Sequence, residues 1–242
     1  YFACAVRTLR CERPLWLPAA ALAVSHALHP STLILTPSLI YLAWRQRERG
    51  WGYGFASVAC PYVLIGGATV LLMTAGGHGL SALFTTDRPG GADARWFVPL
   101  RETSTRWEHY TLLSWLHLRD ILNEMLLVAP VTLPSLALVG LLARPQLCAA
   151  WQASAEIRFF ALASLFYLLL AFIWNPDYGG QRDWDLFAPA YLPATILLAL
   201  LLSRVGDMKR QLGHAGSALI LTSLLHTLAW VFSNTRPWEW PT

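Results

Sequence analysis

Six apolar regions, separated by short polar segments, dominate the pattern of hydrophobic and polar positions along the 242-residue chain. A helix needs about 20 mostly apolar residues to cross a bilayer, and most of these regions approach that length. The pattern predicts an all-α, polytopic membrane protein with about six to seven transmembrane or half-membrane helices and one interfacial amphipathic helix. The six regions cover residues 15–44, 55–74, 121–142, 159–174, 188–202 and 215–232.

The first region is too long for one straight span. About 30 residues of helix would rise roughly 45 Å, whereas the hydrocarbon core is about 30 Å thick. His29 and Pro30 divide the region, because proline disfavours helix in the residue before it. We therefore expect half-length helices over 15–28 and 31–44, which form either a kinked span or a hairpin that dips into the bilayer.

Arginines in the connecting segments predict the orientation of the chain, because cytoplasmic loops carry an excess of basic residues. By this rule the cytoplasmic segments are 45–54, 143–158 and 203–214, and the outward ones are 75–120, which would include the interfacial helix, 175–187 and 233–242. The N-terminal segment also has a cytoplasmic character, through Arg7, Arg10 and Arg13. If this segment is cytoplasmic, the first region must be a hairpin.

The composition narrows the class of protein. Hydrophobic residues make up 55% of the chain and charged residues 13%, about half the charge of a soluble domain. This excludes an ordinary soluble enzyme, a nucleic-acid-binding domain and a disordered tail. Four cysteines without CxxC spacing predict neither a disulfide framework nor a zinc site. We expect one integral membrane domain over 1–242, in a bacterial inner (plasma) membrane.

The densest polar cluster is the sequence NPDYGGQRDWD over 175–185. Asp183 and Asp185 are two residues apart and point the same way in an extended segment, so they could act as catalytic carboxylates or hold Mg²⁺ or Mn²⁺. Arg182 could grip a phosphate through two parallel hydrogen bonds, and Asp177 completes a candidate substrate site. The alternative is a solvated loop whose Arg–Asp pair caps the next helix.

A second cluster lies in the sequence WEHYTLLSWLHLRDILNEM over 107–125. His117, Asp120 and Glu124 share a face at helical spacing. They could supply a general base or line a substrate cavity, with Asp120 as a catalytic candidate, or they could form a polar face wetted by solvent. At the break in the first region, His26 and His29 could line a cavity, His29 as a substrate contact, or could satisfy backbone carbonyls freed by the break.

Two segments resemble the polytopic C-type (GT-C superfamily) glycosyltransferases, which use polyprenyl-phosphate-linked sugars. One is AVSHALHPSTLILTPSLIYLAW, an apolar helix broken at Pro30 and followed by a second short apolar helix. The other is RDWDLFAPAYLPATILLALLL, where Pro189 and Pro193 follow an outward arginine as in the family. In this chain Asp185 stands four residues before Pro189, and Arg182 three residues earlier. The resemblance covers the middle and C-terminal part of such an enzyme.

The resemblance implies transfer of a sugar from a polyprenyl-phosphate donor at the extracytoplasmic face. Its partners would be a lipid-linked sugar and membrane lipids. The sequence begins at Tyr1 without Met, and we expect it to be part of a longer chain with further spans upstream. Two alternatives stay open: a non-catalytic subunit that packs against other membrane subunits, and a lipid or small-solute transporter, although the two halves show no self-similarity.

Overall fold

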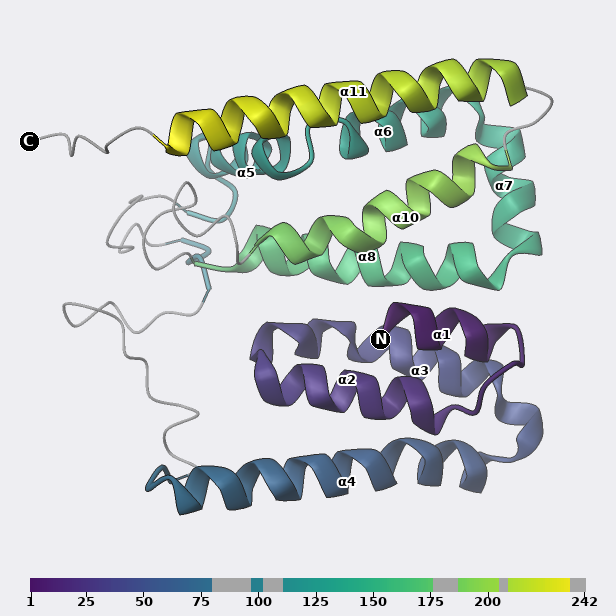
Figure 1. The fold of residues 1–242 in the computed structure, drawn as a ribbon, viewed down its shortest axis with the longest axis vertical. Coiled ribbons are helices and arrows are strands. Elements are labelled where there is room, and N and C mark those ends of the chain that lie inside the picture. Colours follow the sequence, from purple (N-terminus) through teal and green to yellow (C-terminus); the bar gives the residue numbers. More distant parts are fainter. Residues whose placement is uncertain (80–96, 102–110, 176–186, 205–208, 236–242) are drawn as a thin grey trace, which may run out of the picture.

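The computed structural model describes residues 1–79, 97–101, 111–175, 187–204 and 209–235. Over these residues the structure is all-helical, and most helices lie side by side, whereas α7 runs across one end (Figure 1). The elements are α1 (Phe2–Leu9), α2 (Trp16–Leu28), η1 (Pro30–Leu35), α3 (Thr36–Arg45), η2 (Arg47–Arg49), α4 (Trp51–Ala75), α5 (Trp115–Val128), α6 (Thr132–Leu142), α7 (Arg144–Ala153), α8 (Ala155–Ile173), η4 (Ala188–Ala190), α10 (Tyr191–Leu202) and α11 (Lys209–Asn234).

Within the described ranges, three helices are long and apolar enough to cross a membrane, namely α4, α8 and the part of α11 from Gly216 to Ser233. The pair α5 and α6 makes a fourth if it counts as one broken span. The structure thus supports three or four spans of full length rather than the six to seven expected. Two further apolar helices, α2 and the 188–202 segment, are shorter. These apolar helices indicate a membrane protein.

The first apolar region folds as a hairpin. The helix α2 ends at Leu28, and the next residue, His29, is extended, with φ −149° and ψ 106°. The chain then returns through η1 and α3 (Figure 1). Thr8 precedes this region and Gln46 follows it, yet the Gln46 Nε2 donates a 3.2 Å hydrogen bond to the Thr8 carbonyl. A kinked single span would place these residues at opposite ends, so the hairpin alternative is confirmed.

The third apolar region is not the continuous helix that its length suggests. The axes of α5 and α6 are bent by 100° at a break of a few residues. Ala129 there has φ −146° and ψ 70°, outside the helical range. Pro130 explains the break, since it donates no backbone hydrogen bond and disfavours helix at Ala129.

The helix α8 lies at the centre of the packing. Its Phe159 and Phe160 are almost fully buried and meet the N-terminal aromatic rings: the Phe2 centroid lies 6.2 Å from Phe159 and 5.6 Å from Phe160. Leu22 of α2 and Leu39 of α3 belong to the same core. This core joins the hairpin to the C-terminal helices.

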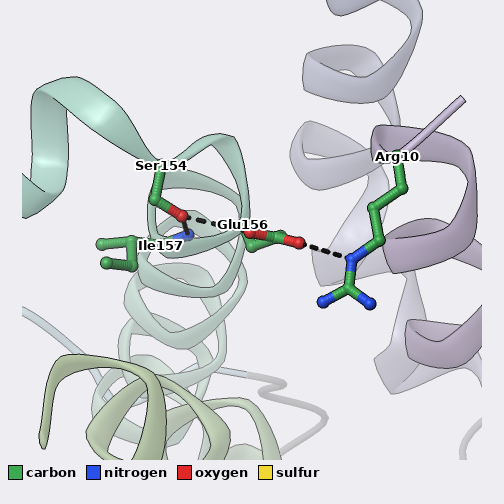
Figure 2. A network of polar contacts seen from close by, with 4 residues as sticks. All are labelled: Arg10, Ser154, Glu156 and Ile157. Atoms are coloured by element: carbon green, nitrogen blue, oxygen red, sulfur yellow. Dashed lines mark hydrogen bonds and ion pairs between the residues drawn. The ribbon is translucent and has the colours of Figure 1, made fainter. Parts of the chain in front are cut away.

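An ion pair ties α1 to the first turn of α8 (Figure 2). The Arg10 Nε donates to Glu156 Oε1 at 2.8 Å. Ser154 caps α8 by accepting from the Ile157 N–H at 3.3 Å, and its hydroxyl donates to Glu156 Oε2 at 3.3 Å. The Arg10 end of α1 therefore lies beside the segment that links α7 to α8. We call this end of the helices, with η2 and α7, the connector end.

Candidate functional site

The helix α5 buries polar side chains and exposes apolar ones, which is the reverse of a helix in a soluble protein, and in this sense we call it inverted. His117 is 1% exposed and Glu124 6% exposed, whereas apolar side chains of the same helix face outward. A solvated polar face over His117 and Glu124 is therefore excluded, and the arrangement fits a helix whose surroundings are lipid. The outward-facing apolar residues are Trp115, Leu116, Leu118, Leu122 and Leu126.

His117 is held by the turn that precedes α5. The Ser114 hydroxyl caps the helix by accepting from the His117 backbone N–H at 3.4 Å. The His117 Nδ1 lies 2.7 Å from the Leu112 carbonyl oxygen. Because a carbonyl only accepts, Nδ1 carries the proton in this bond, and a neutral ring then presents Nε2 as an acceptor. The imidazole also packs on Phe172 of α8, with centroids 5.2 Å apart.

Asp120 lies to the side of this buried pair. Its side chain is 36% exposed and lies 3.4 Å from the Arg119 guanidinium, which is itself 53% exposed. The structure therefore brings His117 and Glu124 into the interior and leaves Asp120 near the surface. Its catalytic assignment stays a prediction.

Tyr191 is a site residue that sequence reasoning missed. It begins α10 and is 4% exposed. Its hydroxyl has no hydrogen-bond partner among the described residues. A buried hydroxyl is normally hydrogen-bonded, so this group is unusual among the described residues. A tyrosine at the start of an otherwise apolar run was the only sequence signal.

Tyr191 lines a cavity of about 900 Å³ between the break after α5, the helix α10 and the helix α11. Its wall is mostly aliphatic, from Leu127 and Ala188 at one end to Leu202 and Gly216 at the other. The polar side chains in the wall include Thr195, which lies 3.1 Å from Thr132 of α6 (oxygen to oxygen), and His226 of α11. The volume and apolar character of the cavity suit a hydrocarbon chain.

At the tip of the first hairpin, His26 hydrogen-bonds a backbone carbonyl and His29 a side-chain hydroxyl. The His26 Nε2 donates to the Thr32 carbonyl at 3.0 Å, so its Nδ1 accepts from the Tyr62 hydroxyl, also at 3.0 Å. The interpretation of His26 as a partner for a freed carbonyl is thus confirmed. The His29 Nδ1 lies 2.7 Å from the Ser31 hydroxyl at the exposed tip, and its role as a substrate contact stays a prediction.

The hairpin tip meets the residues that flank segment 176–186. Ser31, Trp174 and Phe187 line one small cleft. Trp174 also pairs with Phe97, and the Val98 N–H donates to the Ile173 carbonyl at 2.9 Å. We call this end of the helices, with η1, the start of α5 and η4, the loop end.

Four predicted site residues, Asp177, Arg182, Asp183 and Asp185, lie outside the described residues. Their segment leaves the described chain at Asn175 and returns at Phe187; these two residues are buried, at 3% and 4% exposure. Within the described ranges, no group of three His, Cys, Asp or Glu side chains could hold a metal ion. The carboxylates proposed to bind Mg²⁺ or Mn²⁺ are not among those ranges.

Comparison with known proteins adds no family. No protein-family model, curated protein or solved structure matches the chain.

Proposed function

We propose that the chain is a membrane glycosyltransferase-like protein that transfers a sugar from a polyprenyl-phosphate donor at the loop end. One observation carries the proposal: the apolar cavity of about 900 Å³ has at its loop end Tyr191, whose hydroxyl is buried and has no hydrogen-bond partner among the described residues. A lipid tail needs a long apolar cavity, and its phosphate needs polar groups at the cavity mouth. The flanks of the hydrophilic segment 176–186 lie at the same end.

The proposed role of each residue in the transfer reaction follows from the chemistry of its side chain. Arg182 would bind the donor phosphate, since a guanidinium pairs with two phosphate oxygens. A carboxylate, Asp183 or Asp185, would take the proton of the acceptor hydroxyl as it attacks the anomeric carbon. The same two carboxylates have the oxygen donors that Mg²⁺ or Mn²⁺ prefers, and such an ion would neutralise charge on the departing phosphate.

The shorter helices complete the proposed membrane domain. Counting α2, α3 and α10 as half-length or tilted membrane helices beside the full-length ones gives the six to seven originally expected. With the connector end in the cytoplasm, as its arginines indicate, the cavity mouth faces outward, and the bacterial inner membrane is the proposed location.

Binding is tested first, because it needs no acceptor. The chain is placed in lipid nanodiscs and titrated with undecaprenyl phosphate, with thermal unfolding as the readout. Ala199→Trp fills the cavity wall, and Leu165→Trp places the same bulk on a 62% exposed position of α8. We expect a rise in Tm with ligand that Ala199→Trp abolishes and Leu165→Trp retains. Absence of any rise, or equal rises in both variants, would reject the lipid-phosphate site.

Transfer is tested with radiolabelled polyprenyl-phosphate hexoses and pentoses and a membrane extract as the acceptor source. We expect labelled product from the unmodified chain, and its loss in Asp183→Asn and Asp185→Asn. Glu48→Gln, an exposed acid of the connector end, serves as the matched control and retains transfer. Binding without transfer would favour the alternative of a non-catalytic subunit that works beside other membrane proteins.

A further inference from the structure

A second apolar groove, remote from the loop end, lies between α3 and α4. It measures about 550 Å³. On the α3 side, the lining residues recur at helical spacing: Thr36, Leu39, Ile40, Ala43, Trp44 and, just beyond the helix, Arg47. On the α4 side, the lining residues are Gly50, Trp51, Gly54, Phe55, Val58 and Tyr62. Trp51 and Phe55 are more than 70% exposed, so the groove is open along its side.

Glycine helps to leave the groove open. A Cβ added at Gly54 would meet no atom within 4 Å, so the space beside this residue is empty of protein. Gly50 has φ +94°, a value that side-chain-bearing residues rarely adopt, and it lets the chain turn from η2 into α4. The groove therefore begins directly at the connector end.

The length of the groove matches one leaflet of a bilayer. The helical path from Thr36 to Arg47 rises about 16–18 Å at 1.5 Å per residue, and half of the hydrocarbon core is about 15 Å. The apolar walls would thus lie within one leaflet, with Arg47 at the headgroup level. This position suits a lipid of the connector-end leaflet.

Arg47 supplies the charge at the groove mouth. Its guanidinium carbon lies 4.6 Å from the centroid of the Trp44 ring, and its Nη1 donates to the Trp44 carbonyl at 3.3 Å. This bond uses one of the N–H donors of the guanidinium, and the rest have no protein partner among the described residues. Arg45 on the same connector adds positive charge, which attracts anionic headgroups.

From these observations we infer that the groove is a specific binding site for one anionic phospholipid. An acyl chain lies between α3 and α4, and the Arg47 guanidinium donates hydrogen bonds to the lipid phosphate. Charge complementarity at the mouth and the one-leaflet length together select this occupant. The inference requires only that the helices lie in a membrane, and it is independent of the proposed glycosyl transfer.

The test uses the groove tryptophans, Trp44 and Trp51, as reporters. The chain is reconstituted in vesicles that contain phosphatidylglycerol or phosphatidylcholine with brominated acyl chains at equal mole fraction, and tryptophan quenching is recorded. Subtracting the signal of the Trp44→Phe/Trp51→Phe variant isolates the two reporters. We expect at least twofold stronger quenching by the brominated phosphatidylglycerol.

Two matched pairs of variants locate the effect. Arg47→Gln should abolish the preference for phosphatidylglycerol, whereas Arg49→Gln, whose guanidinium is engaged with the Tyr53 hydroxyl at 3.4 Å, should retain it. Gly54→Leu should fill the groove and weaken quenching by either lipid, and Gly66→Leu, at another open position on α4, should not. Equal quenching by the two lipids, a preference that survives Arg47→Gln, or quenching unchanged in Gly54→Leu would each overturn the inference.

Discussion

The side-chain amide of Gln46 donates a hydrogen bond to the backbone carbonyl of Thr8, at 3.2 Å and across 38 positions of sequence. Both residues are buried, although a half-length helix and a return path lie between them. This bond closes the first hairpin at the connector end, and it fixes which chain segments share a side of the membrane.

The hairpin predicts that Cys11 and residue 48 face the same compartment. In a background without the other cysteines, native Cys11 and a Glu48→Cys variant should both react with a membrane-impermeant maleimide only after the membrane is permeabilised. Both positions are exposed, so access is limited by the membrane alone. His78→Cys, beyond the far end of α4, should react in intact cells. Opposite labelling of positions 11 and 48 would contradict the hairpin.

The bond from Tyr62 to His26 predicts a measurable loss of stability on Tyr62→Phe. The change keeps the ring but removes the hydroxyl that donates to His26 Nδ1 at 3.0 Å. A lost hydrogen bond of this kind costs about 1 kcal/mol, which lowers the Tm of a chain of this size by about 2–4 °C. Thr74→Val, on the same helix, removes an exposed hydroxyl that donates only to the Val70 carbonyl one turn earlier, and it should shift the Tm less. An equal fall in Tm in both variants would show that the hydrogen bond between Tyr62 and His26 at the hairpin tip makes no special contribution to stability.

The hydrogen bond made by His117 predicts that the protein is more stable with asparagine at this position than with phenylalanine. His117→Phe retains packing on Phe172 but leaves the Leu112 carbonyl without its 2.7 Å side-chain donor, a change that costs about 1–3 kcal/mol. His117→Asn restores a donor, so its Tm should lie between that of His117→Phe and the unmodified chain. His78→Asn is the exposed control. If His117→Phe is as stable as the unmodified chain, the hydrogen bond to Leu112 contributes nothing.

The pair of Arg10 and Glu156 predicts a salt-dependent effect. The Glu156 carboxylate raises the pKa of the Arg10 guanidinium, so the arginine stays charged at neutral pH. Glu156→Gln should lower the Tm more than Arg10→Gln, because Glu156 also accepts from Ser154 and lies at a helix N-terminus, where negative charge is favourable. The Tm should be measured at low salt and at 1 M NaCl. The Arg10→Gln shift should shrink at high salt; a constant shift would assign its effect to packing.

Proline shows where sequence reasoning about this fold succeeds and where it stops. Pro30 was expected to break the first region, and it does. Pro130 breaks the third region, which was expected to be continuous, whereas Pro61 stays inside α4 without ending the helix. The local chemistry is the same at all three sites. The residue type alone therefore does not decide whether a helix ends at a proline, and the packing of the surrounding helices has to be known.

The candidate site shows the same division between local and distant information. Helical spacing was sufficient to put His117 and Glu124 on one face. It could not show that this face is buried, because the burial of His117 depends on packing against Phe172 of α8. Tyr191 itself was missed for the same reason, since its significance comes from the cavity that it lines together with residues of other helices.

The inverted helix α5 also constrains how the protein is inserted during translation. Phe172, which packs on His117 of its buried face, is synthesised later than α5. Alone, a helix that carries Arg119, Asp120 and Glu124 partitions poorly into lipid, since a charged residue near its middle costs about 2.5–3.5 kcal/mol. We therefore expect α5 to insert stably only once α8 is present to cover its buried face.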